Sequence, residues 1–265
     1  NALTLNGENQ KAKNGLWQTL EKWSEVDRSS LVLLADVPTE SRAMEHVVKD
    51  DPALGLHTLA GRAADRDAVA MRVLGLLCIP GRLIPEDKSR GAQWLRESAD
   101  SGDQLSRYYL GEGAVFGILP GLSKEEGFQE VLSASATGES LAQELEGILL
   151  IRGDLVKVDP AKGWKRLLSA VDKGNVEAKL PLALCYASGT GTPRDKEAAT
   201  RLFRELAANG NPLAMCLLGK CLSHGFGITP SRVEASRWMK KAAMSGHEEA
   251  HQWCSRRGIN LVVSR

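Results

Sequence analysis

The sequence predicts an all-α fold: a right-handed α-α superhelix, or solenoid, built from helix–turn–helix units of 36 residues. Three observations predict it. Helix-capping residues recur at this spacing, and two columns of small residues hold the same period without insertion. The helix-stopping column consists of glycine alone, at Gly102, Gly138, Gly174, Gly210 and Gly246. Several independent columns with one period indicate a repeat array.

The capping column places the start of the second helix, helix B, in each unit. Its members all have a side-chain oxygen that can accept a hydrogen bond from the first helical turn: Asp51, Asp87, Ser123, Asp159, Asp195 and Ser231. Proline follows Asp51 and Asp159 at the first helical position, where its fixed φ is favourable. Helix B is therefore expected at 87–100, 123–136, 159–172, 195–208 and 231–244.

The first helix of each unit, helix A, is expected at about 67–80, 104–116, 140–152, 176–188 and 212–224. A small residue within it lets a neighbouring helix approach closely, in the column Gly75, Gly111, Gly147, Ala183 and Gly219. The turn after helix A contains a second column: Gly81, Gly117, Gly153, Gly189 and Gly225. These glycines are interpreted as structural, at a close helix contact or at a turn.

The most regular unit resembles a known repeat. Ala214 to Gly246 follows the pattern A-x3-L-G-x5-G-x-G-x7-A-x2-W-x3-A-A-x2-G, which is similar to the Sel1-like repeat, a relative of the tetratricopeptide repeat. The match is close for 211–246, clear for 175–210, partial for 67–174 and a trace at 31–66. Departures include Ala183 in the glycine column and Leu202 in the tryptophan column. The resemblance implies an α-solenoid whose members usually bind other proteins.

The predicted organisation is one array with a cap at each end. Residues 1–30 form an N-terminal capping helix, with Trp17 and Trp23 available for packing. The array covers 31–246, and residues 247–265 form a C-terminal capping helix and tail. The array units are about 31–66 (degenerate), 67–102, 103–138, 139–174, 175–210 and 211–246.

Composition argues against several classes of function. The 265 residues carry 34 Lys and Arg against 33 Asp and Glu, a net charge of +1, so no basic excess points to nucleic acid. No apolar run reaches the roughly 18 residues that span a bilayer. The chain begins at Asn1 without a methionine. A removed signal peptide would place it in the bacterial periplasm, and the cytoplasm is the alternative.

No catalytic motif is visible, and neither a catalytic residue nor a cofactor nor a metal is predicted. The nearest candidate is the group His247, His251 and Cys254, whose i, i+4, i+7 spacing puts three potential zinc ligands on one helix face. Cys254 is equivalent to the core position Leu218, so a packed capping helix is the preferred interpretation. A metal-dependent regulator or enzyme using this group stays as an alternative hypothesis. The five cysteines have no paired spacing and are expected to be buried hydrophobic residues.

The predicted binding surface is a stripe along helix A, opposite the face that packs on helix B. Its middle is more apolar than a solvated helix face, which is typical of a binding groove on a concave surface. The alternative is that helix A is packed on both sides and the stripe is core. The helix-A stripe comprises Arg72, Leu76, Ile79, Tyr108, Glu112, Val115, Glu144, Ile148, Ile151, Leu180 and Leu184.

The resemblance to Sel1-like proteins implies a non-catalytic module that binds another protein and is a monomer when free. Among bacterial Sel1-like proteins it suggests an immunity protein that neutralises a type VI secreted phospholipase or other toxin effector. A scaffold or regulator of an envelope assembly or signalling pathway is the alternative.

Overall fold

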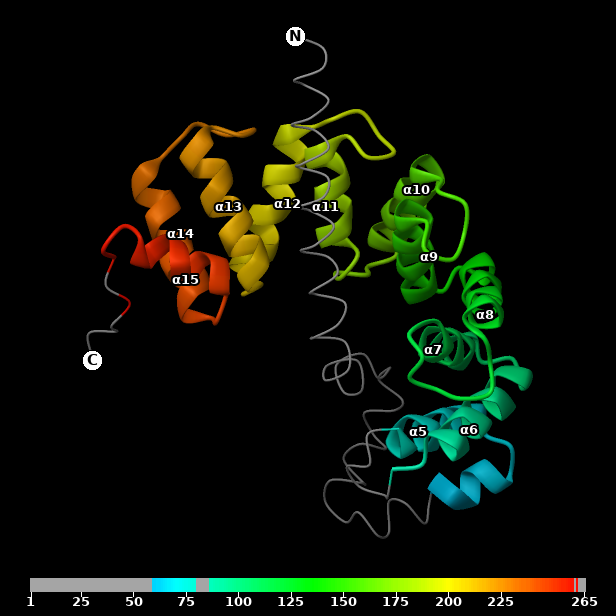
Figure 1. The fold of residues 1–265 in the computed structure, drawn as a ribbon. Helices are drawn as coiled ribbons and strands as arrows, with labels where there is room; N and C mark the ends of the chain where they lie inside the picture. Colours follow the sequence, from blue (N-terminus) through cyan, green and yellow to red (C-terminus); the bar gives the residue numbers. More distant parts are fainter. Residues whose placement is uncertain (1–58, 80–85, 260, 262–265) are drawn as a thin grey trace. The chain divides into compact units, whose positions relative to one another are not determined.

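The computed structural model describes residues 59–79, 86–259 and 261, and all regular secondary structure in these residues is helical. The predicted N-terminal cap and the capping residue Asp51 lie outside the described residues. A helical stretch at 59–64 precedes the labelled helices of Figure 1. These are α5 (Ala68–Cys78), α6 (Lys88–Asp100), α7 (Gln104–Val115), α8 (Lys124–Thr137), α9 (Ser140–Arg152), α10 (Pro160–Asp172), α11 (Lys179–Ser188), α12 (Lys196–Ala208), α13 (Pro212–His224), α14 (Arg232–Met244) and α15 (Glu248–Ser255).

The helices alternate as helix A and helix B, which confirms the predicted repeat. Within a repeat α5 packs against α6, α7 against α8, α11 against α12 and α13 against α14. Helix B also packs against the following helix A, as α6 does on α7 and α12 on α13. One helix starts later than predicted: the Asn175 side chain accepts from the backbone N–H of Glu177 and Ala178, so a turn precedes α11.

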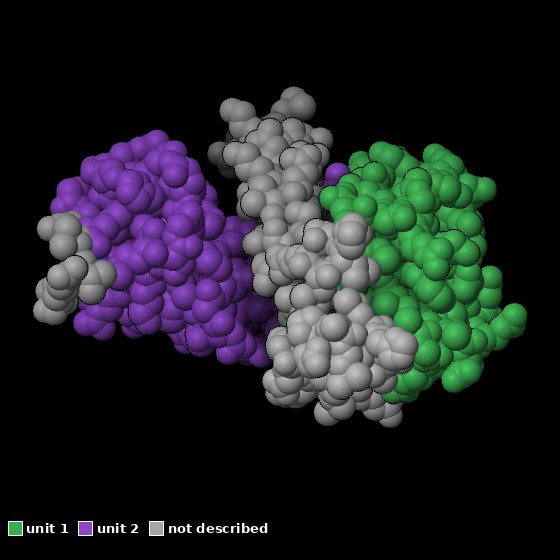
Figure 2. All heavy atoms as spheres, turned by 90° about the horizontal axis from the view of Figure 1, so that it is seen from below, with its two compact units in different colours: residues 1–149, 154–156 green, residues 150–153, 157–265 purple. Residues whose placement is uncertain are grey.

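The chain forms two compact units, shown in different colours in Figure 2. Unit 1 comprises Asn1–Leu149 and Asp154–Val156, and unit 2 comprises Leu150–Gly153 and Lys157–Arg265. Helix α9 lies in unit 1 except for its last turn. The repeats from α10 onward lie in unit 2.

The predicted capping residues begin every described helix B. Asp87, Ser123, Asp159, Asp195 and Ser231 are N-caps, and each accepts a hydrogen bond from the backbone N–H three residues later. These bonds satisfy donors that the first helical turn leaves free. At the other end of each helix B the glycine column has positive φ, between 87° and 97°. The local chemistry of both helix ends therefore follows the 36-residue register.

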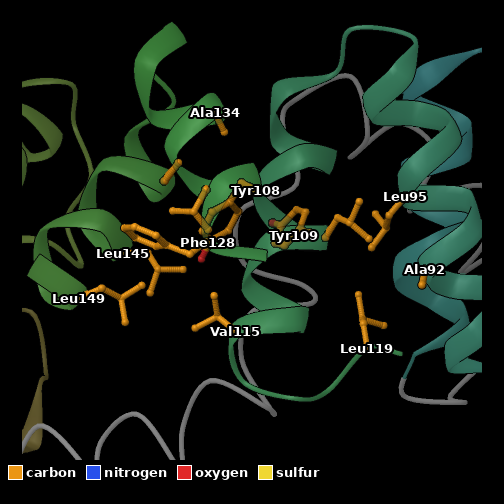
Figure 3. Close-up of a cluster of buried hydrophobic side chains, with 13 residues drawn as sticks. Ala92, Leu95, Tyr108, Tyr109, Val115, Leu119, Phe128, Ala134, Leu145 and Leu149 are labelled. Carbon is orange, nitrogen blue, oxygen red and sulfur yellow. The ribbon is translucent and has the colours of Figure 1, made fainter. Parts of the chain in front are cut away.

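Unit 1 has a continuous hydrophobic core between α6, α7, α8 and α9. Figure 3 shows Leu95 of α6, Tyr109 of α7, Phe128 of α8 and Leu145 of α9 among its side chains. The α7–α8 crossing is close, because a Cβ on Gly111 would lie 2.6 Å from the carbonyl oxygen of Gly127. Only residues without a side chain allow this approach. The small-residue column thus sets the distance between helix A and helix B.

In unit 2 a glycine in the loop after helix A touches the preceding repeat. Gly227 has φ 61°, and a Cβ there would lie 2.2 Å from the carbonyl oxygen of Lys196, at the start of α12. Gly191 repeats this contact with Pro160 of α10, at 1.9 Å. The second glycine of each G-x-G turn is therefore the point where two repeats meet.

Side chains hold this junction. The Thr200 hydroxyl donates to the carbonyl oxygen of Phe226 over 2.8 Å. The Arg194 guanidinium lies 5.1 Å and the Lys196 ammonium 5.5 Å from the centre of the Phe226 ring, within the range of cation–π contacts. The loop after α13 is thus fixed on α12 by backbone contact, one hydrogen bond and two cations.

Candidate partner-binding surface

The helix-A stripe is largely buried in the structure. Eight of its eleven residues are buried, namely Arg72, Tyr108, Glu112, Val115, Glu144, Ile151, Leu180 and Leu184. Leu76, Ile79 and Ile148 are partly exposed. A partner can contact only those atoms that the free chain leaves accessible. The stripe as a binding surface therefore stays a prediction, and its three partly exposed aliphatic residues are where contact is easiest.

The charged end of the stripe is part of an internal network. Arg72 of α5 forms an ion pair with Asp103, with 2.6 Å between Arg72 Nη1 and the carboxylate. Asp103 is also the N-cap of α7, and it accepts from the backbone N–H and hydroxyl of Ser106. The Ser98 hydroxyl joins this network, because it lies 2.8 Å from the Ser106 hydroxyl, and it donates to the carbonyl oxygen of Ala68. Arg72 therefore ties α5 to the start of α7, which is a structural role.

The central aromatic residue of the stripe is also internal. Tyr108 is 3% exposed, and its hydroxyl donates to Glu112 Oε1 over 2.6 Å. Tyr108 and Val115 both belong to the unit 1 core (Figure 3). Leu76 and Ile79 pack against the same cluster. A helical wheel cannot reveal this, because the contact is made between successive repeats. Helix A in unit 1 is thus packed on more than the face that meets helix B.

In unit 2 the stripe residues Leu180 and Leu184 lie on α11, and both are almost fully buried. The equivalent stripe position on α13 is Lys220, whose Nζ lies 2.6 Å from the Glu249 carboxylate of α15. The neighbouring Cys216 is buried and 3.9 Å from the same carboxylate. The face of α13 that is equivalent to the stripe is therefore where α15 packs.

The C-terminal His and Cys residues do not converge. His247 is the N-cap of α15, its Nδ1 accepting from the backbone N–H of Ala250 over 3.3 Å. His251 is exposed, whereas Cys254 is fully buried. Within the described ranges no group of three His, Cys, Asp or Glu side chains could hold a metal ion. His247 caps α15 and Cys254 belongs to its buried face.

The cysteine thiols are buried and poorly suited to act as nucleophiles. All five are free, as their lack of paired spacing suggested. Burial raises the pKa of Cys185 to about 12. Burial likewise raises the pKa of Cys216 to about 12, with the Glu249 carboxylate acting in the same direction and Lys220 opposing it. The reactive form of a cysteine is the thiolate, so these thiols are inert near neutral pH.

The exposed large apolar side chains lie outside the stripe. In the described residues they are Phe116 and Ile118 in the loop after α7 and four residues of unit 2: Val158, Val176, Val233 and Met244. The binding surface predicted from the sequence was confined to helix A and did not include these exposed apolar residues. For Val233 and Met244 the exposure could have been predicted, because both occupy positions of helix B that face away from the repeat's own core.

The fold and register define a class: a tandem array of capped helix pairs is a helical repeat protein of the solenoid type. Three of its repeats match the Sel1 repeat. The Sel1 repeat family model matches residues 68–103, 177–211 and 212–247, which are three of the predicted units within one or two residues. No curated protein sequence matches the chain. The unmatched stretch between them includes the units that had only a partial match to the pattern.

Solved structures share this fold. A Sel1 repeat protein from Oxalobacter formigenes superimposes with a TM-score of 0.72 and 23% identity, covering 83% of this chain and 92% of that one. A protective antigen of uropathogenic Escherichia coli strains, which displays an SLR fold, superimposes with a TM-score of 0.68 and 25% sequence identity. The match covers 78% of this chain and 45% of the antigen. A Sel1 repeat protein from Klebsiella pneumoniae superimposes with a TM-score of 0.51 and 19% sequence identity, covering 75% of this chain and 97% of that one.

In the part of the chain that the structure describes, no helix is both long and apolar enough to cross a membrane.

Proposed function

We propose that this chain is a non-catalytic module that binds another protein. The observation that carries the proposal is the fold itself, a series of capped helix pairs, three of which match the Sel1 repeat, that pack on the next helix within each unit. Such arrays present extended surfaces, and repeat proteins of this class use them to hold partners. The partly exposed Leu76, Ile79 and Ile148 of the helix-A stripe supply aliphatic contacts for an anchoring segment.

The finer proposal is an immunity protein that neutralises a type VI secreted phospholipase or other toxin effector, acting in the periplasm or, alternatively, in the cytoplasm. It is supported by the resemblance of the repeats to immunity-type Sel1 proteins, which is an analogy at the level of the family. A scaffold or regulator of an envelope assembly or signalling pathway is the second candidate.

The test is capture of the partner from lysate of the source organism, followed by its identification and an assay of lipase activity. The comparison variant is Leu76→Gln with Ile148→Gln, because Tyr108 is buried and Tyr108→Asp would disturb the core. Val158→Gln with Val176→Gln is the matched control, since both valines are exposed elsewhere. We expect a single partner that the control retains and the stripe variant loses.

A lipase that the wild-type chain inhibits would support the immunity role. An envelope component in its place would favour the scaffold. Equal capture by both variants would place the binding surface off the stripe.

A further inference from the structure

One exposed position of helix B differs in chemistry between the two units. The residue six positions after the N-cap is exposed in all five described B helices. It is glutamine in both B helices of unit 1 and a cation in all three of unit 2: Gln93, Gln129, Lys165, Arg201 and Arg237. We call Lys165, Arg201 and Arg237 the cationic column. They lie at one position of the register on α10, α12 and α14, three helices labelled in Figure 1.

The cations of the column are not paired with any residue that the structure describes. Among the described residues, none of its three side chains takes part in an ion pair, a hydrogen bond or a cation–π contact. Other cations of unit 2 are engaged: Lys179 pairs with Glu205, and Lys220 pairs with Glu249. Within the described residues, the column therefore adds no polar contact to the fold of unit 2.

The fold does not require charge at this position either. Gln93 and Gln129 occupy it in unit 1, on helices that begin at the same N-cap position of the register. A glutamine side chain there exposes a similar length of chain to water without a charge. The cations are thus available to bind something outside the chain.

The side chains beside the column are mixed in character. Arg201 has exposed glutamates one turn before and after it, Glu197 and Glu205. On α14 the same helix face carries Val233, which is 65% exposed, and Met244, which is 49% exposed. A membrane or a nucleic acid presents a continuous surface of phosphates, which the glutamates would repel. A protein segment can place its carboxylates against the cations alone and its apolar side chains against Val233 and Met244.

We propose that the cationic column, with Val233 and Met244 beside it, is a docking surface for an acidic segment of another protein. This goes beyond the proposed function, because it concerns helix B and not the helix-A stripe. Charge at such an exposed surface mainly raises the association rate and selects the partner. The bound segment would carry clustered Asp and Glu residues with interspersed aliphatic residues.

The test measures binding of a fluorescein-labelled peptide of repeated Glu-Glu-Leu units by anisotropy, at low and at physiological salt. The column variant is Lys165→Gln, Arg201→Gln, Arg237→Gln, which installs the residue that unit 1 uses. The control is Lys157→Gln, Lys173→Gln, Arg256→Gln, three exposed residues of unit 2 with the same change in net charge. We expect the column variant to bind roughly fivefold more weakly or worse and the control to stay within about twofold of wild type.

Two further arms separate the partner classes: phosphatidylcholine vesicles containing phosphatidylglycerol, and mixed-sequence single-stranded DNA. The proposal is overturned if the column and control variants weaken peptide binding equally, since net charge alone would then act. It is also overturned if the wild-type chain does not bind the peptide, or if vesicles or DNA bind more tightly than the peptide and depend on the column. The Leu76→Gln, Ile148→Gln variant should bind the peptide like wild type, so failure of this inference and of the proposed function are distinguishable.

Discussion

Gly227 and Gly191 illustrate how a single absent side chain sets the distance between two repeats. Both have positive φ, and both place their Cα against backbone of the preceding helix B. The equivalent positions in the loops of unit 1 are Leu119 and Leu155, which instead pack against the hydrophobic core of that unit. The same loop position thus joins repeats in two ways, and the residue type decides which.

Gly227→Ala should therefore destabilise the chain by about 3 kcal/mol or more, because strain at positive φ adds to a clash with the Lys196 backbone. Gly246→Ala is the control. It has a similar φ of 87° and nothing within 4 Å of the added methyl group, so only about 1 kcal/mol is expected. Chemical denaturation measures both. An equal decrease in the free energy of unfolding for both variants would mean that the backbone around Gly227 can move to accommodate the methyl group.

The buried thiols of Cys185 and Cys216 predict a loss of stability at alkaline pH. Both have a pKa of about 12 in the folded chain. Between the ordinary thiol pKa and this raised value the unfolded chain holds fewer protons than the folded one, so the free energy of unfolding falls as pH rises. Each thiol should contribute a loss of about 1.4 kcal/mol by about pH 10.

The measurement compares urea denaturation near neutral pH and near pH 10 for the wild-type chain and for Cys185→Ala with Cys216→Ala. The double variant removes the two thiols but leaves every lysine and tyrosine. It should therefore lose less stability on the alkaline side than wild type does. An identical pH dependence for both would contradict the expectation.

At the scale of the helix, capping chemistry explains why the elements were predictable. Asp195 and Ser231 act locally, so each cap could be recognised from a few residues and from its recurrence 36 residues away. The exposure of the helix-A stripe was not predictable in this way. Tyr108 is buried by contacts between repeats, and these depend on how successive helix pairs pack rather than on the period of one helix.

Helix α15 carries a pH-sensitive cap. Burial lowers the pKa of His247, with the Lys220 ammonium acting in the same direction and the Glu249 carboxylate opposing it. The neutral ring accepts from Ala250, so its stabilisation is complete above the ordinary histidine pKa and is lost as pH falls through the lower folded value. Protonation removes the acceptor and places positive charge at a helix N-terminus.

We expect hydrogen exchange in α15 to quicken as pH falls below the ordinary histidine pKa, after correction for the intrinsic rate, with a loss of about 1 kcal/mol in local stability. His247→Asp keeps an N-cap acceptor that stays ionised in this range and should remove most of the effect. If the aspartate variant shows the same acid sensitivity, the cap is not its source.

At the scale of the whole molecule, the net charge of +1 hides a strong asymmetry. The described residues of unit 2 hold 18 Lys and Arg against 9 Asp and Glu, whereas those of unit 1 hold 8 against 15. A sum over the sequence cannot show this, because the boundary between the units is set by packing. The fold class and register were predictable from residue spacing. The charge of each unit could be counted only once the structure had shown which residues belong to it.

Repeats that contact only their neighbours should transmit damage over a short range. Leu218 of α13 is fully buried, so Leu218→Ala should cost about 2–5 kcal/mol locally. Hydrogen exchange should quicken in α12–α15 and remain unchanged in α6–α8. Val131→Ala, at a fully buried position of α8, should show the reverse pattern. A uniform loss of protection from either variant would indicate that the whole array unfolds as one cooperative unit.

The junction glycines also bear on how such a chain can lengthen. A duplicated copy of residues 211–246 brings both halves of such an interface: a loop glycine that fits against a helix start, and the start of α14, which is equivalent in the register to the start of α12 that receives Gly227. Tandem duplication in this region therefore needs no compensating substitution. A copy of the segment around Leu119 carries a side chain where the glycine contact requires none. New repeats should accordingly arise more readily from the C-terminal repeats, which have glycine at this loop position, than from the repeats that have leucine there.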